Sequence, residues 1–171
     1  MTRFQTLIAS LVTVFALPAF AQDHMMVSDA YARVNGAMGA SGAIFLQIEN
    51  PSDVEDQLID VKSDAAKKVE LHTHQASADG VMQMLHVPEG FPVPAMGTLS
   101  LERGGHHVML MGLTKALEDG DMIHLTLVFK NAGEVAIDVP VDNARKPGAM
   151  GEGKAMDKSN HMGHAKTAPS N

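Results

Sequence analysis

The sequence predicts an all-β fold, a sandwich or barrel with Greek-key connections. From Val27 to Val141 it consists of short apolar runs, several of which alternate with period two or are rich in β-branched side chains. Turn-forming sequences such as Asn50-Pro51-Ser52 and Asp119-Gly120-Asp121 separate these runs. Roughly seven to nine short strands at regular spacing are typical of all-β sandwiches and barrels.

Each apolar run predicts one strand, and the turn-forming residues on either side set its ends. Short helical turns are expected only near 63–68 and 114–118. In chain order, the predicted strands are SGAIFLQIEN (41–50), DQLIDVKS (56–63), KKVELHTH (67–74), GVMQMLHV (80–87), GTLSLE (97–102), HHVMLMGL (106–113), DMIHLTLVFK (121–130) and EVAIDVPV (134–141).

The chain is predicted to have three parts. Residues 1–21 resemble a cleaved signal peptide, with an early cation, an apolar run and an A-x-A cleavage signal. That run is too short for a transmembrane helix, so we expect no membrane span after cleavage. Residues 22–141 are the predicted folded domain. Residues 142–171 contain no Leu, Ile, Val or Phe and are predicted to be a flexible tail.

Composition excludes several classes of function. Acidic residues outnumber basic ones by 20 to 13, which disfavours nucleic acid and anionic membranes as partners. The absence of cysteine excludes thiolate-based blue-copper centres, iron–sulfur clusters and cysteine nucleophiles. Thirteen methionines stand beside no tryptophan. Because methionine is often core filler, the placement of these residues decides their meaning.

Two predicted strands carry histidine or methionine at alternate positions. In 67–74, His72 and His74 share the face opposite Leu71. In 80–87, Met84 shares a face with Met82 and His86. The other face of that strand, which we expect to point inward, consists of Val81, Gln83, Leu85 and Val87. Methionines on the outward face are placed for something other than core packing.

A third strand repeats this pattern. His107 and Met109 share one face about 7 Å apart, since each strand residue rises about 3.3 Å, and both can reach one ion above the strand. With His72 and Met84 they make a set of two imidazoles and two thioethers. Neutral thioether sulfur is a soft ligand that suits Cu(I), whereas zinc, calcium and magnesium prefer other donors. The set therefore predicts a Cu(I) site.

The order of these segments resembles the PCu(A)C family of bacterial periplasmic copper chaperones over about residues 27–141. The family's motif is a His, usually followed by Met, then ten residues, a Met, about twenty-one residues and H-x-M. On this chain it falls on His72, Met84, His107 and Met109. The resemblance implies a cupredoxin-like fold, a periplasmic location, and delivery of Cu(I) to cytochrome oxidase, particularly its Cu(A) centre.

The chain departs from the motif in two places. Thr73 stands where the family often has Met, and the gap between Met84 and His107 holds twenty-two residues. His106 would fit the literal spacing, but Val108 then replaces the last thioether, so His107 is the predicted ligand.

Further copper ligands are predicted outside the domain. The tail carries His161, Met162 and His164, which could hold a second copper, as Cu(II) or Cu(I). Cleavage after Ala21 would place His24 third from a free amine, an arrangement that suits square-planar Cu(II).

Two other functions compete with a copper carrier. A zinc enzyme could use His72, His74 and His107, but the chain lacks a general base in a motif such as H-E-x-x-H. An adhesion or interaction module would leave the paired Met and His faces unexplained. The sequence therefore favours a non-catalytic copper carrier.

Overall fold

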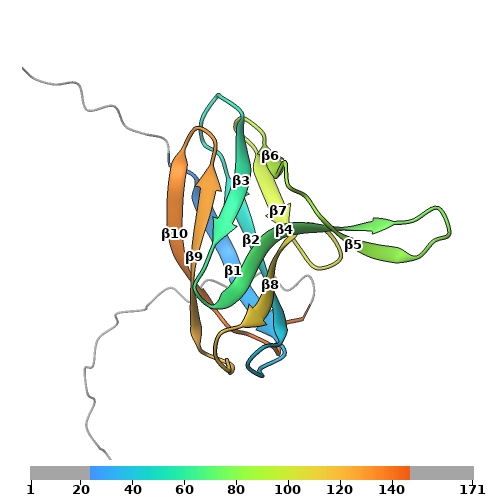
Figure 1. The fold of residues 1–171 in the computed structure, drawn as a ribbon. Helices are drawn as coiled ribbons and strands as arrows, with labels where there is room; N and C mark the ends of the chain where they lie inside the picture. Colours follow the sequence, from blue (N-terminus) through green and yellow to red (C-terminus); the bar gives the residue numbers. More distant parts are fainter. Residues whose placement is uncertain (1–23, 147–171) are drawn as a thin grey trace, which may run out of the picture.

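The computed structural model describes residues 24–146, whose strands form two antiparallel sheets packed face to face (Figure 1). The described strands are β1 (Met26–Val34), β2 (Ser41–Glu49), β3 (Asp56–Lys62), β4 (Ala66–Ala76), β5 (Met82–His86), β6 (Phe91–Val93), β7 (Thr98–Leu101), β8 (His107–Leu113), β9 (Met122–Phe129) and β10 (Gly133–Pro140).

The strand order confirms the predicted all-β fold. One sheet, which we call sheet A, runs β1-β2-β8-β4-β5, and β7 also pairs with β2; the other, sheet B, runs β10-β9-β3-β6. β7 and β8 share one edge of β2, since β7 pairs with its second half and β8 with its first half. Chain neighbours are often not sheet neighbours, so the connections cross between the sheets.

The core lies between the sheets and follows the alternation of the sequence. Ile44, Leu46 and Ile48 of β2 are buried against Leu125 and Leu127 of β9 in one apolar cluster. Burying a side chain of this size stabilises the fold by about 1.5–3 kcal/mol. Because strand side chains alternate, the residues between these core positions in sheet A face outward, and His72, His107 and Met109 lie on that outer face.

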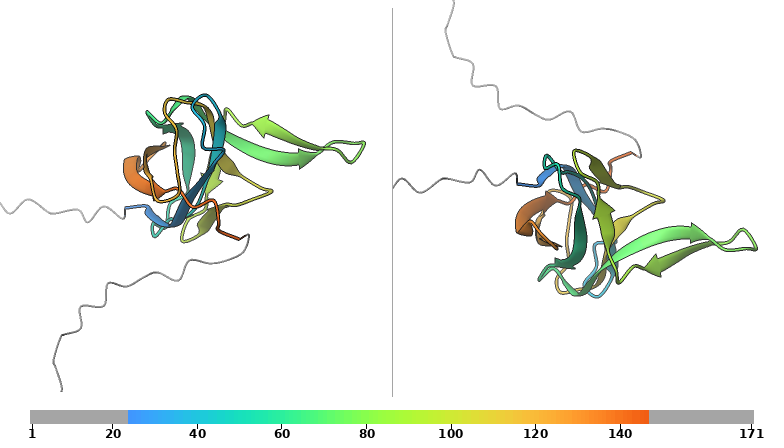
Figure 2. Two further views of the ribbon diagram at one scale, coloured as in Figure 1. Left: turned by 90° about the horizontal axis from the view of Figure 1, so that it is seen from below. Right: turned by 90° about the horizontal axis from the view of Figure 1, so that it is seen from above.

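The β4–β5 hairpin extends well beyond the sandwich (Figures 1 and 2). All five residues of β5 are exposed, and among residues 24–146 β5 pairs only with β4. The expectation that Val81 and Leu85 point inward is therefore wrong, because sheet B does not reach this far and gives them no core to enter. Val87, at the base of the hairpin, does pack against the core.

The two expected helical turns are absent from the described residues. Ala66–Lys68 already belong to β4, and 114–118 form an irregular connection. The Thr114 hydroxyl donates to the carbonyls of Asp64 and Ala65 and so ties the two segments together. These are long-range bonds, across 49 and 50 positions, so tertiary contacts rather than helical bonds hold both short stretches.

One loop requires a glycine. Gly90 adopts φ of +78°, and a Cβ there would lie 2.0 Å from the Leu58 carbonyl oxygen. Gly90 lies between the hairpin and β6, a three-residue strand at a place where the sequence pattern predicted none.

Residues 142–145, which we call the strap, lie against β1. The Asp142 amide donates to the Ala32 carbonyl, and the Val34 amide donates to the Asn143 side chain. Arg145 pairs with Asp29 and lies 4.3 Å above the centre of the Tyr31 ring. The predicted tail thus begins with a segment that contacts the domain. The predictions for 1–21 and for most of the tail lie outside the described residues.

Within 24–146, no helix has the length and apolar character needed to cross a membrane.

Candidate metal centre

Five rings form one row across the outer face of sheet A, which we call the ring row. Register pairs Tyr31 with Phe45, and His72 with both His107 and His86. Phe45 and His107 lie one position beyond the last β2–β8 pair. From β1 to β5 the distances between ring centres are 5.1, 6.3, 6.0 and 5.7 Å. Strand pairing therefore brings together two of the four predicted ligands, His72 and His107.

His107 is only 1% exposed although it points away from the core. Phe45 flanks it on one side, and the ring of His74 lies 5.0 Å away on the other. Its Nδ1 lies 3.1 Å from the Gly105 carbonyl oxygen. Because a carbonyl only accepts, Nδ1 carries the proton and Nε2 keeps a free lone pair.

Burial lowers the pKa of His107, so its imidazole is neutral at neutral pH. A neutral imidazole is the form that binds a metal ion. His107 therefore has a neutral ring whose Nε2 is available to a metal ion.

His72 also has one ring nitrogen held by a neighbour, but it is the opposite nitrogen of the ring. Its Nε2 lies 3.1 Å from a carboxylate oxygen of Glu70 and donates to it. Its Nδ1 is buried and has no hydrogen-bond partner among the described residues. An unpartnered buried polar atom costs about 1–3 kcal/mol, so its presence calls for an explanation. One explanation is that Nδ1 binds a metal ion, which fits the donors His107 and Met109 on the neighbouring strand.

Glu70 is the residue that orients His72. A hydrogen bond from Lys68 is the main cause that lowers the pKa of this carboxyl, with His72 contributing, so Glu70 is ionised and accepts. Its other oxygen lies 3.7 Å from Nε2 of His86. Carboxylates that hold the second nitrogen of a metal-binding histidine set its tautomer and orientation.

The two predicted thioethers lie on opposite sides of the ring row. Met109 shares the face of His107 and pairs with Glu70, whereas Met84 pairs with His74 on the exposed hairpin. In a flat sheet, two strand spacings and four residues separate Met84 from Met109, on the order of 16 Å between Cα atoms. Both thioethers can therefore reach one ion only if the hairpin bends so that Met84 on β5 moves toward Met109 on β8.

The remaining histidines differ in position. His106 lies on the opposite face, with Nδ1 3.0 Å from the Thr73 hydroxyl and its ring 4.1 Å from that of Phe91. It is thus directed away from the ring row. Among residues 24–146, no three His, Asp or Glu side chains converge as metal ligands, so the predicted zinc set of His72, His74 and His107 gains no support.

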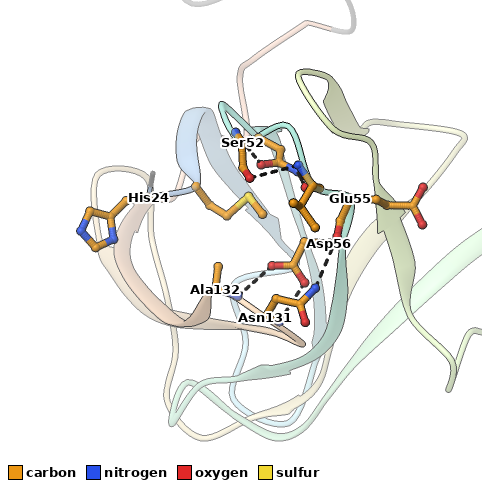
Figure 3. A pocket seen from close by; sticks show the side chains of 9 residues that line it. His24, Ser52, Glu55, Asp56, Asn131 and Ala132 are labelled. Carbon is orange, nitrogen blue, oxygen red and sulfur yellow. Dashed lines mark hydrogen bonds between the residues drawn. The ribbon is translucent and has the colours of Figure 1, made fainter. Parts of the chain in front are cut away.

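His24 borders a different cleft, of about 250 Å³, whose lining includes no residue of the ring row (Figure 3). Its side chain is exposed and points away from Asp56. The Asp56 carboxylate accepts from the amides of Asn131 and Ala132, which stabilises the β9–β10 turn. The polar groups of Asp56 in this cleft are therefore used to hold the β9–β10 turn. His161, Met162 and His164 lie outside the described residues.

Sequence reasoning missed three parts of this centre. Alternation placed Glu70 on the face of His72, and that signal could have revealed its orienting role. Phe45 and Tyr31 gave no local signal, because only strand register places them beside His107. Both are buried yet absent from the main core, as expected for side chains that cover an outer-face site.

We expect Glu70→Gln to weaken metal binding by about 10–100-fold, because the amide can turn its NH₂ toward His72 and favour the wrong tautomer. Affinity titration of the purified protein measures the change. Glu134→Gln is the matched control, since Glu134 also pairs with a lysine but lies on sheet B. Equal affinities for both variants would show that Glu70 is an ordinary surface carboxylate.

Comparison with known proteins gives two sequence matches. Residues 25–141 match the family described as "Putative lipoprotein LpqE-like". "Putative lipoprotein Lxx21020" of Leifsonia xyli subsp. xyli (strain CTCB07) is 34% identical over 131 residues, which cover 73% of this chain and 77% of that protein.

Solved structures share the fold, among them the following three. The copper-bound PCuAC domain from PmoF2 has a TM-score of 0.56 and 26% identity, covering 72% of this chain and 96% of its own. The apo PCuAC domain from PmoF1 has a TM-score of 0.55 and 28% identity, covering 69% and 92%. The Cu(I) form of DR1885 from Deinococcus radiodurans has a TM-score of 0.53 and 29% identity, covering 74% and 84%.

Proposed function

This chain belongs to the LpqE-like family and has the fold of PCuAC domains, and on that premise we propose that it is a non-catalytic copper chaperone. The observation that supports this most is the pair His72 and His107. Each has one ring nitrogen held by a neighbour and the other left with a lone pair on the same face. Copper-bound relatives with this fold add to the argument.

The proposed ligands are Nδ1 of His72, Nε2 of His107 and the thioethers of Met109 and Met84. The first three are neighbours on β4 and β8. Met84 completes the set when the hairpin bends, and bending has a low free-energy cost because, among residues 24–146, β5 pairs only with β4. All four ligands are neutral, and soft sulfur favours Cu(I), so copper is carried without a change of oxidation state.

We assign the mature protein to the cell envelope, and specifically to the periplasm after removal of 1–21. The description of its relatives as putative lipoproteins supports a location outside the cytoplasm.

The proposed recipient is a respiratory oxidase, in particular the Cu(A) centre of cytochrome c oxidase. Neutral ligands support this role, because they release copper more readily than thiolates do.

X-ray absorption on the mature protein loaded with one equivalent of Cu(I) tests the function. Two sulfur and two nitrogen scatterers are expected, together with transfer of the copper to an apo Cu(A) domain. A reduced copper surrounded only by nitrogen and oxygen, or a protein that takes up no Cu(I), would contradict the proposal.

We further propose that His161, Met162 and His164 hold a second copper, and that His24 holds Cu(II) with a free N-terminal amine. A chain stopped after Lys146 keeps the strap and removes only the tail residues beyond it. We expect it to lose one equivalent of copper while its Cu(I) affinity at the ring row stays unchanged, since no ring-row residue is removed. Copper stoichiometry and Cu(I) competition measure the two effects. Unchanged stoichiometry would show that the tail binds no copper.

A further inference from the structure

The exposed fraction of the histidines in the proposed copper centre falls steadily from β5 through β4 to β8. His86 on β5 has a side chain that is 45% exposed, His72 on β4 one that is 11% exposed, and His107 on β8 is 1% exposed. A donor protein cannot touch His107 directly. Copper exchange between proteins needs ligands that both partners can reach, so it must begin at the exposed side of the row.

His86 is placed to take part in this exchange. It pairs with His72 across the hairpin, and their ring centres are 5.7 Å apart. Met84, 46% exposed, shares its face two residues away. The pair Met84-x-His86 on β5 thus mirrors the pair His107-x-Met109 on β8, and His72 lies on the strand between them.

We propose that His86 is a transient copper ligand that forms, with Met84 and His72, an outer position where Cu(I) arrives and leaves. The proposal rests on the proposed copper-chaperone function. The inner position uses His72, Met84, His107 and Met109. Copper passes inward when His107 and Met109 replace His86, and outward when His86 replaces them.

The exchange is balanced and keeps the ion bound throughout. Every ligand concerned binds the ion as a neutral imidazole or thioether, so Cu(I) stays Cu(I) and no electron is transferred. Nε2 of His72 is held by Glu70, which leaves only Nδ1 for the ion. Because His72 offers one lone pair, the two positions share it and hold one copper between them.

If His86 does not bind copper in the resting complex, its removal should change the rates of Cu(I) capture and release but not the Cu(I) affinity. We expect His86→Gln to slow both capture of Cu(I) from a chromophoric chelator and release to a second one by about tenfold. The affinity, which is the ratio of these rates, should stay within about threefold of wild type. Stopped-flow absorbance under reducing, anaerobic conditions measures both.

His124→Gln is the matched control. His124 is 63% exposed and faces Asp138, much as His86 faces Glu70, but it lies on sheet B away from the ring row. Its rates and affinity should equal those of wild type.

A second measurement uses Met109→Leu, which weakens the inner position and moves copper toward the outer one. In that background, we expect His86→Gln to lower the Cu(I) affinity itself by about tenfold or more, so the two substitutions are non-additive.

Wild-type rates in His86→Gln, or additive effects on affinity, would overturn the outer position while leaving the chaperone function intact. A loss of affinity in the single variant would also overturn it, since His86 would then be a permanent ligand. Failure of the wild-type protein to bind Cu(I) would overturn the proposed function and this inference with it.

Discussion

Replacing both Met84 and Met109 by leucine is expected to lower the Cu(I) affinity by at least about a hundredfold, because altering only the surroundings of a metal ligand already costs 10–100-fold. Folding should be almost unchanged. Leucine and methionine have similar volumes, and such swaps cost under about 1.5 kcal/mol each even in cores. Met84 is 46% exposed, so its replacement should cost less. Cu(I) competition titrations and thermal melts of the apo protein measure the two effects.

The matched control is the double variant Met38→Leu with Met96→Leu. Both residues are strongly exposed and lie on loops outside the ring row. This control should keep wild-type copper affinity. If instead the Met84 and Met109 variant lost stability and kept its affinity, the two methionines would be packing residues and the ligand set would be wrong.

Loading with Cu(I) is expected to raise the midpoint of thermal unfolding, and His72→Gln should abolish the rise. A ligand present at a thousand times its dissociation constant stabilises the native state by about 4 kcal/mol. For a domain of this size, that corresponds to an increase on the order of 15 °C. Calorimetry of apo and Cu(I)-loaded protein measures it.

The apo form of His72→Gln adds a sharper test. The wild-type protein keeps the Nδ1 atom of His72 buried without a partner, which costs about 1–3 kcal/mol. Glutamine can still donate to Glu70 but has no such ring nitrogen, so the apo variant should be at least as stable as wild type. An apo variant that is clearly less stable than wild type would show that His72 is a structural residue. A variant that still gains stability from Cu(I) would show that His72 is not a required ligand.

The strands and their faces followed from the sequence, because the alternation of polar and apolar residues is a local property. Alternation placed Leu71 and Val108 in the core and put His72, His107 and Met109 on the opposite face. The softness of thioether ligands then indicated Cu(I), and the absence of cysteine excluded thiolate centres. These steps depend on residue type and spacing alone.

Alternation failed on β5, where it predicted an inward face that has no core beside it. Whether a strand is covered depends on the reach of the other sheet, and sheet B stops short of the hairpin (Figure 2). A period-two pattern shows which side chains share a face. It does not show whether anything packs against that face.

Register was the other property that only the tertiary structure decided. A shift of one residue between paired strands would turn every side chain of the shifted strand to the other face. The register itself depends on contacts between segments that lie far apart in the chain. Register placed Phe45 beside His107 and put Met84 opposite His74 rather than His72. Residue chemistry determined which side chains could bind copper, whereas strand pairing decided which of them lie within reach of one ion.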